Sequence, residues 1–304
     1  MASQQAYLRV LGKDGPNIPA LGLGLMGVSA GFLDYAVELG ATFWDTSDIY
    51  GEGEEMLGRW FRQSGKRDKV FLATKFGLIM DGLKMLGVDS TAEYCKKACE
   101  SSLAKLGVES IDLFYAHRVN LETPVEETMR AMVDLQKEGK IKHIRLCGTA
   151  YSPFVRSIES DEGIALLATC RELEAYLPTG AFTTQDSVSG ADDIRAKLMP
   201  WWSEENLPTN AKAVGQLEAF ASKKQCSVAQ LTLAWILKQG SEMFAIPGTK
   251  KQKYLKENWD ALEIILSDDE EAEIRKFVES IELAGFRSTP EAKALSYVDT
   301  AKEA

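Results

Sequence analysis

Phe43-Trp-Asp-Thr-Ser-Asp-Ile-Tyr-Gly51 is the segment from which the architecture of this chain can be read, because a short apolar run ends in Asp45 and a tyrosine, Tyr50, follows five residues later. Two later apolar runs, residues 69–74 and 111–116, also end at an ionisable side chain. Those side chains are Lys75 and His117. Where the carboxyl ends of parallel strands converge on one face, such residues are typical of an active site.

Strand and helix patterns alternate around this segment, which predicts repeated βα units. Expected strands span residues 19–24, 41–44, 69–74, 111–116 and 141–146, and expected helices span 31–39, 54–61, 90–107 and 123–139. The last two helices open on apparent capping boxes, Ser90-Thr-Ala-Glu93 and Thr123-Pro-Val-Glu126. Further on, the pattern predicts helices at 163–173, 210–223, 228–238, 254–266 and 268–282, with strands at 175–177 and 243–246. Such units form a parallel sheet, either open and doubly wound or closed into a barrel.

The glycine-rich segment Gly22-Leu-Gly-Leu-Met-Gly27 does not by itself decide between these two folds. It fits the dinucleotide-binding pattern G-x-G-x-x-G, with Asp45 about 20 residues further on. Glycines equally allow a tight turn at the end of a barrel strand. The convergence of the strand ends that precede Lys75 and His117 favours the closed form, so we predict an α/β fold with a (β/α)₈ TIM barrel.

The four ionisable residues also make chemical sense as a group. A phenol has a reference pKa near 10, too high for efficient proton transfer at neutral pH, and a nearby ammonium lowers it. A lysine in a dry pocket in turn needs a carboxylate to stay charged. The combination of Asp, Tyr, Lys and His therefore indicates acid–base chemistry.

These residues and their surroundings resemble the aldo-keto reductase family, whose members are NADP-dependent (β/α)₈ barrels that reduce carbonyls. The matching motifs are Asp45-Thr-Ser-Asp-Ile-Tyr-Gly-Glu-Gly-Glu54, Ala73-Thr-Lys-Phe76, Ile111-Asp-Leu-Phe-Tyr-Ala-His117 and Ala245-Ile-Pro-Gly-Thr-Lys250. The similarity is greatest to the pyridoxal-reductase and aryl-alcohol-dehydrogenase-like branch. It implies one barrel domain over residues 1–304 and an NADPH-dependent reduction of an aldehyde or ketone.

The resemblance also assigns expected roles. Tyr50 would donate a proton to the carbonyl oxygen, Lys75 paired with Asp45 would lower the pKa of Tyr50, and His117 would orient the carbonyl. The other histidine, His143, is expected to be structural. The residues expected to contact NADP are Asp45 and Tyr176 near the nicotinamide, Gly248, Thr249 and Lys250 at the 2′-phosphate, and Glu257 and Asn258 at the adenine.

The chain departs from the family pattern after residue 146. Leu146-Cys-Gly-Thr-Ala150 runs directly into Tyr151-Ser-Pro-Phe154, where the family has a further helix, most of a strand and the ligands of the nicotinamide carboxamide. The seventh strand is also shortened. Whether the barrel is complete around strands six and seven therefore stays open. The alternative function is a catalytically weak or inactive NADP-binding barrel that acts as an interaction or regulatory protein.

Composition and charge argue against several other classes of function. A net charge of −10 argues against nucleic-acid binding, which needs clustered cations. No apolar run reaches the roughly 20 residues of a membrane helix, and the N-terminus carries no signal-peptide pattern, so we expect a cytoplasmic enzyme without a membrane partner. The five cysteines are scattered and expected to be reduced, and Cys95 and Cys99, with no histidine nearby, are not expected to bind a metal. The expected partner is a small-molecule carbonyl compound, and oligomeric state is not specified by the sequence.

Overall fold

The computed structural model of the chain describes residues 7–82, 84–146, 200–281, 283–285 and 299–303. The chain divides into two compact units, one formed by residues 1–169, 246–252 and 294–304 and the other by residues 170–245 and 253–293. The predicted helix at 163–173 and the predicted strand at 175–177 lie outside the described residues. That the two units form a single barrel domain stays a prediction.

The first unit is built on a parallel five-stranded sheet in the order β3-β4-β5-β8-β9. Its strands are β3 (Leu23–Gly24), β4 (Phe43–Asp45), β5 (Phe71–Phe76), β8 (Ile111–Ala116) and β9 (Ile141–Leu146). Gly24 forms a parallel bridge to Gly248 as well as to Asp45, so the sheet continues past β3 toward the residues around Gly248. All five predicted strands are therefore confirmed, two of them with the same bounds.

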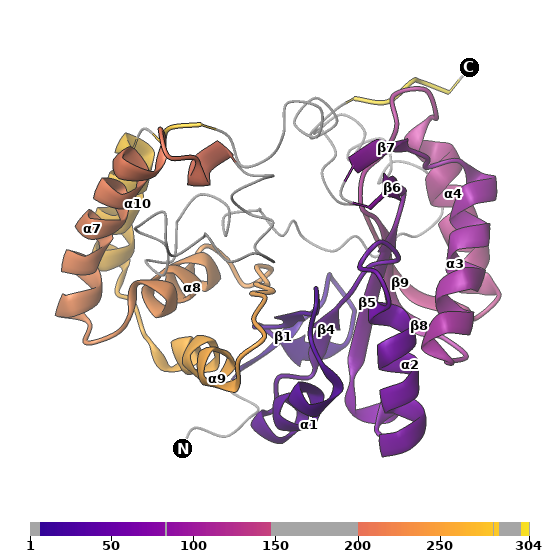
Figure 1. The fold of residues 1–304 in the computed structure, drawn as a ribbon, viewed down its shortest axis with the longest axis horizontal. Helices are drawn as coiled ribbons and strands as arrows, with labels where there is room; N and C mark the ends of the chain where they lie inside the picture. The colour runs from indigo at the N-terminus through magenta and orange to yellow at the C-terminus, as the bar shows by residue number, and fades with distance from the viewer. Residues whose placement is uncertain (1–6, 83, 147–199, 282, 286–298, 304) are drawn as a thin grey trace. The chain divides into compact units, whose positions relative to one another are not determined.

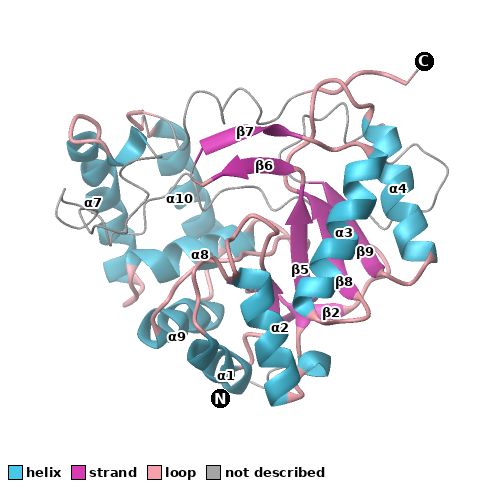
Figure 2. Ribbon diagram, turned by 45° about the vertical axis from the view of Figure 1, so that its right-hand side comes forward, coloured by secondary structure: helices cyan, strands magenta, loops and turns pink. Residues whose placement is uncertain are grey.

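Four helices alternate with these strands along the chain and lie against one face of the sheet (Figures 1 and 2). They are α1 (Ala30–Leu39), α2 (Gly53–Ser64), α3 (Ala92–Leu106) and α4 (Val125–Lys137). Strands of a parallel sheet are commonly buried on both faces, and every residue of β8 is buried. This is the alternating βα order of a (β/α)₈ barrel, and the strand predicted at 175–177 lies outside the described residues.

Two hairpins were not predicted. The first is β1 (Leu8–Val10) with β2 (Asn17–Pro19), and the second is β6 (Leu78–Asp81) with β7 (Lys84–Val88). Conversely, residues 243–246, predicted as a strand, form none in the structure. Short antiparallel hairpins carry only weak alternation, which explains why the sequence pattern missed them.

Both predicted capping boxes are wrong in detail. The N-cap of α3 is Thr91, whose hydroxyl accepts from the Tyr94 amide, whereas the Ser90 hydroxyl accepts from the Asn120 amide. Helix α4 has Pro124 at its N-cap and no side-chain cap of its own; the amide of its first residue donates to the Thr300 hydroxyl at 3.3 Å. At α3 the local cap is shifted by one residue, and at α4 a contact distant in sequence replaces it.

The described part of the second unit is helical. It contains η5 (Pro200–Trp202), α7 (Leu207–Lys223), α8 (Val228–Lys238), α9 (Gln252–Asp260), η6 (Ala261–Glu263) and α10 (Asp268–Ser280). Ser267 and Glu270 form a reciprocal capping box at the start of α10. No helix in the described ranges has both the length and the apolar character needed to cross a bilayer.

Candidate active site

The register of the sheet places the ionisable residues on one face. Lys75 in β5 is paired with Tyr115 in β8, which is paired with Arg145 in β9, so these three side chains are cross-strand neighbours. Asp45 pairs with Ala73 of β5. Ala73 lies two residues before Lys75, so Asp45 and Lys75 are on the same face of the sheet. Thr74, which points the other way, bonds to Glu54 of α2 on the helix-covered face.

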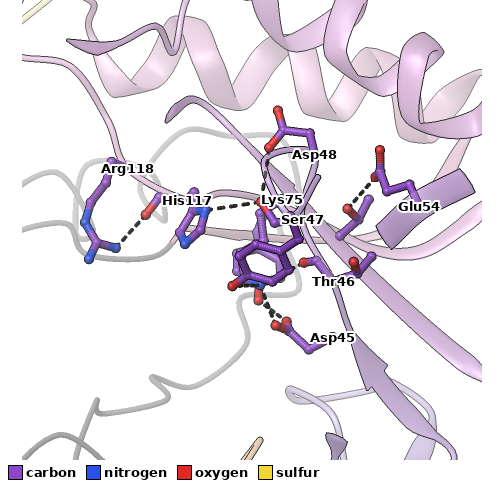
Figure 3. Close-up of polar contacts among 11 residues, drawn as sticks. Asp45, Thr46, Ser47, Asp48, Glu54, Lys75, His117 and Arg118 are labelled. Carbon is purple, nitrogen blue, oxygen red and sulfur yellow. Dashed lines mark hydrogen bonds and ion pairs between the residues drawn. The ribbon is translucent and has the colours of Figure 1, made fainter. Parts of the chain in front are cut away.

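Lys75 is the centre of this cluster (Figure 3). Its ammonium forms an ion pair with Asp45 and donates to the Thr46 carbonyl at 2.8 Å and to the Tyr50 hydroxyl at 3.4 Å. Asp45 and Lys75 are only 3 % and 4 % exposed. A charge so deeply buried is tolerated only with a partner, so the carboxylate fixes the ammonium in its charged form beside the phenol.

Tyr115 completes the coordination of Asp45, and sequence reasoning missed it. Its hydroxyl donates to the second carboxylate oxygen of Asp45, and its ring lies 5.3 Å from the Lys75 ammonium and 5.4 Å from the Arg145 guanidinium. The aromatic ring thus lies between two cations that stand on the strands either side of β8. The only sequence signal was its position two residues before His117, on the same face of β8.

The imidazole of His117 lies edge-on to the phenol ring of Tyr50. The two rings are 6.3 Å apart between centroids and almost perpendicular, and the His117 amide donates to the Phe76 carbonyl at 2.7 Å. Burial, together with the charges of Lys75 and Arg118, holds the pKa of His117 well below its usual value. The imidazole is therefore neutral at physiological pH.

Ser47 contacts both His117 and Asp48, and no role was predicted for Ser47 or Asp48 from the sequence. The Ser47 hydroxyl donates to Asp48 at 3.1 Å and lies 3.3 Å from Nδ1 of His117 (Figure 3). Burial raises the pKa of Asp48 to about 6, despite the hydrogen bond from Ser47. Their place between Asp45 and Tyr50 in the sequence was visible, but their direction toward His117 was not.

The raised pKa of Asp48 has a consequence for stability. The unfolded chain loses this proton near pH 4 and the folded chain near pH 6, so stability falls as pH rises between these values. Asp48→Asn removes the ionisation but keeps an acceptor for Ser47, and we expect it to raise the free energy of unfolding by roughly 1–2 kcal/mol above about pH 7 and by nothing near pH 4. Urea unfolding at both pH values measures this. The same gain at both pH values, or a similar gain in the exposed control Asp68→Asn, would contradict it.

A second group of predicted residues lies around β3. Gly248 bridges to Gly24, and the side chain of Lys250 lies over Gly27, where a Cβ atom would come within 2.9 Å of the ammonium. Gly27 has a φ of 74°, which also favours glycine. Thr249 bonds to the amide of Lys251 at 3.2 Å. The glycine-rich segment therefore makes room for a cation instead of opening a dinucleotide-binding helix.

The other predicted cofactor contacts are distributed differently. Glu257 and Asn258 lie in α9 of the second unit, both partly exposed, and the Glu257 carbonyl accepts from Gln230 at 3.0 Å. Tyr176 lies outside the described residues. His143, expected to be structural, packs its half-buried ring 6.0 Å from that of Phe71 in β5. Among the residues that the structure describes, no group of three or more His, Cys, Asp and Glu is placed to hold a metal ion.

Comparison with known proteins gives a consistent result. A model of the Aldo/keto reductase family matches residues 27–169 and 161–279. Aldo-keto reductase str7 of Strobilurus tenacellus is 41 % identical over 84 % of this chain and 82 % of its own length. Aldo-keto reductase yakc of Schizosaccharomyces pombe, whose name specifies NADP(+), is 37 % identical over 96 % of this chain and 97 % of its own. The structure of a glycerol dehydrogenase from Gluconobacter oxydans superposes with a TM-score of 0.74 at 23 % identity, covering both chains completely.

The same comparisons locate the departure from the family pattern. The alignment with the S. pombe protein extends over 335 positions, more than the 304 residues of this chain, so it includes positions where only the relative has residues. The family match is also split into two parts that overlap at residues 161–169. The first observation shows that this chain lacks residues that the relative has, and the second places a break in the family match at residues 161–169, before the strand expected at 175–177.

Proposed function

The chain belongs to the aldo/keto reductase family, and from this we propose that it reduces an aldehyde or ketone with NADPH, with Tyr50 as the proton donor. The observation that carries the proposal is the position of the Lys75 ammonium, in contact with both Asp45 and the Tyr50 hydroxyl, with His117 beyond the phenol ring. Lys75 and His117, which follow two different strands, both contact Tyr50, and Asp45 holds the ammonium, so the phenol lies beside groups that can assist its proton transfer.

The residues around Gly24 and Gly27 fit an NADPH molecule. The Lys250 ammonium, held over a glycine that has no side chain to occupy the space, offers the charge that a 2′-phosphate needs. Gly248 and Thr249 would add backbone and hydroxyl contacts to the same phosphate, and Glu257 and Asn258 would bond the adenine. We include Asp45 and Tyr176 as contacts near the nicotinamide. When bound, NADPH supplies a hydride to the carbonyl carbon.

The chain's own residues supply the proton. His117, a neutral imidazole beside the ring of Tyr50, would hydrogen-bond the substrate oxygen and position the carbonyl for protonation. Tyr50 then transfers its phenol proton to that oxygen, which yields the alcohol and a phenolate. Lys75 stabilises the phenolate by charge, and Asp45 keeps the ammonium in place. Tyr50 regains a proton from solvent before the next cycle.

The test of the proposal is NADPH oxidation by the purified protein with a panel of aromatic and heterocyclic aldehydes, followed at 340 nm. Consumption that depends on both aldehyde and protein supports it. The alternative is an NADP-binding barrel with weak or no turnover and a regulatory or interaction role, which the apparent internal deletion favours. Quenching of tryptophan fluorescence by NADPH, without reduction of any carbonyl, would support the alternative.

The cofactor assignment makes a separate prediction. Replacing Lys250 by methionine removes the cation beside Gly27, so we expect the Kd for NADPH to rise roughly tenfold, the effect of about one charge-assisted hydrogen bond. The Kd for NADH, which lacks the 2′-phosphate, is expected to change little. Lys253→Met, at another exposed lysine of the same segment, is the matched control. An equal loss of affinity for both nucleotides would show that Lys250 does not read the phosphate.

A further inference from the structure

Ser47 connects His117 to a carboxylate that takes no direct part in the proposed reaction. Ser47 is 1 % exposed, and its hydroxyl lies 3.1 Å from Asp48 and 3.3 Å from Nδ1 of His117. Figure 3 shows the three side chains in a row, with the imidazole at one end and the Asp48 carboxylate at the other. No bulk water is needed to connect them.

A hydroxyl has one proton and can donate only one hydrogen bond. When Asp48 is ionised it can only accept, so Ser47 donates to it and must accept from His117. Nδ1 then carries the proton of the neutral ring, and Nε2 is left with a lone pair. When Asp48 is protonated it can donate to Ser47, which can then donate to Nδ1, and the ring proton moves to Nε2.

We propose that Ser47 and Asp48 are positioning residues that set the tautomer of His117, so that the protonation of Asp48 decides whether Nε2 offers a hydrogen-bond donor or an acceptor to the substrate oxygen. The change adds one proton to Asp48, and the proton on the ring transfers from one nitrogen to the other. The consequence for catalysis rests on the proposed function. A donor at Nε2 bonds to a carbonyl oxygen and favours reduction, whereas an acceptor bonds to an alcohol hydroxyl and favours oxidation.

The groups around Asp48 set the pKa of its carboxyl at about 6. Burial is the main cause of the raised pKa, near 6; the Glu54 carboxylate of α2 raises it further, and the Lys105 ammonium of α3 and the Ser47 hydroxyl lower it. Tyr94 of α3 also faces Asp48. On the other side, Lys75 and Arg118 keep the imidazole neutral. Asp48 therefore changes charge near pH 6, while the imidazole at the other end of the network stays neutral.

Nuclear magnetic resonance of the free protein tests the proposal without any turnover. The chain has two histidines, so protein labelled with ¹⁵N-histidine gives two ring systems, and His143→Gln identifies the signals of His117. Long-range ¹H–¹⁵N couplings report which ring nitrogen is protonated. We expect His117 to carry its proton on Nδ1 at about pH 8 and on Nε2 at about pH 5, with a midpoint near the pKa of Asp48.

Two variants complete the test. Asp48→Asn cannot ionise and Ser47→Ala breaks the connection, so the pH-dependent exchange of tautomers is expected to disappear in both. An unchanged tautomer across this pH range in the wild type, or an exchange that persists in Asp48→Asn, overturns the proposal. Because the asparagine is isosteric with aspartate, the test does not depend on Ser47→Ala folding.

Kinetics provide a second measurement. In the wild type, kcat/KM for aldehyde reduction is expected to fall roughly tenfold as pH rises through about 6, the effect of one hydrogen bond to the carbonyl oxygen, and to be flat in Asp48→Asn. An activity that falls equally in both proteins argues against the tautomer exchange. If no carbonyl is reduced at all, the proposed function fails, while the tautomer exchange is still decided by the resonances of His117.

Discussion

Replacing Tyr50 by phenylalanine is expected to lower kcat for carbonyl reduction by about 10²- to 10⁴-fold, the contribution of a positioned general acid. The change removes only the hydroxyl that lies 3.4 Å from the Lys75 ammonium, and it keeps the ring that packs against His117. KM and the Kd for NADPH are expected to change little, because neither depends on the transferred proton. Steady-state rates with saturating NADPH and a fluorescence titration of the same protein measure both quantities.

The control for this variant is Tyr35→Phe, which removes a hydroxyl from α1, outside the site. Its rates are expected to equal those of the wild type. If Tyr50→Phe reduces aldehydes as fast as the wild type, another residue supplies the proton, and the proposed mechanism is wrong. If it is inactive and also fails to bind NADPH, the phenol supports the binding site rather than the chemistry.

The positions of the strands could be predicted because parallel strands are buried on both faces. β8 therefore stands out in the sequence as a short, mostly apolar run, and its observed bounds match those expected. The bounds of β9 also match, although three of its six residues, in the sequence IKHIRL, are ionisable. Asp45, Lys75 and His117 could be predicted for the same reason, since each stands where such a run ends. The glycine-rich segment was ambiguous in isolation, and only the converging strand ends resolved it.

What the sequence could not show are contacts between residues far apart in the chain. Tyr115 is one apolar-looking residue of a buried strand until the fold brings Asp45 to its hydroxyl. The expected cap at Thr123 is lost to Thr300, 175 residues from the amide that it accepts from. Ser47 could have faced either side of its turn. In each case the local pattern allowed several partners, and tertiary packing selected one.

The site therefore consists of two parts whose side-chain positions are determined in different ways. The ion pair of Asp45 and Lys75 is fixed by strand register, because both side chains project from neighbouring parallel strands. Tyr50, Ser47 and Asp48 lie in the turn between β4 and α2, where the position of each depends on the side chains it contacts. Strand register positions the charged side chains of Asp45 and Lys75, and the turn positions the groups that donate or accept protons.

This division can be tested by separating stability from activity at the ion pair. Asp45→Asn leaves the Lys75 ammonium buried, 4 % exposed, without its carboxylate. Breaking a buried pair in this way costs about 3–5 kcal/mol, whereas removing both charges is often nearly neutral. We therefore expect Asp45→Asn to lower the free energy of unfolding by that amount, and Asp45→Asn combined with Lys75→Met to recover most of it.

Activity, unlike stability, is not expected to recover in the double variant. The double variant regains its fold but has no ammonium beside Tyr50, so its kcat stays as low as that of Lys75→Met alone. Urea unfolding and aldehyde reduction measured on the same four proteins, including the wild type, form a double-mutant cycle in which stability is strongly coupled and activity is not rescued. A double variant as unstable as Asp45→Asn would mean that its effect comes from lost hydrogen bonds to Tyr115 and not from an uncompensated charge. A double variant that is both stable and active would remove Lys75 from the mechanism, because the phenolate of Tyr50 would then need no neighbouring cation.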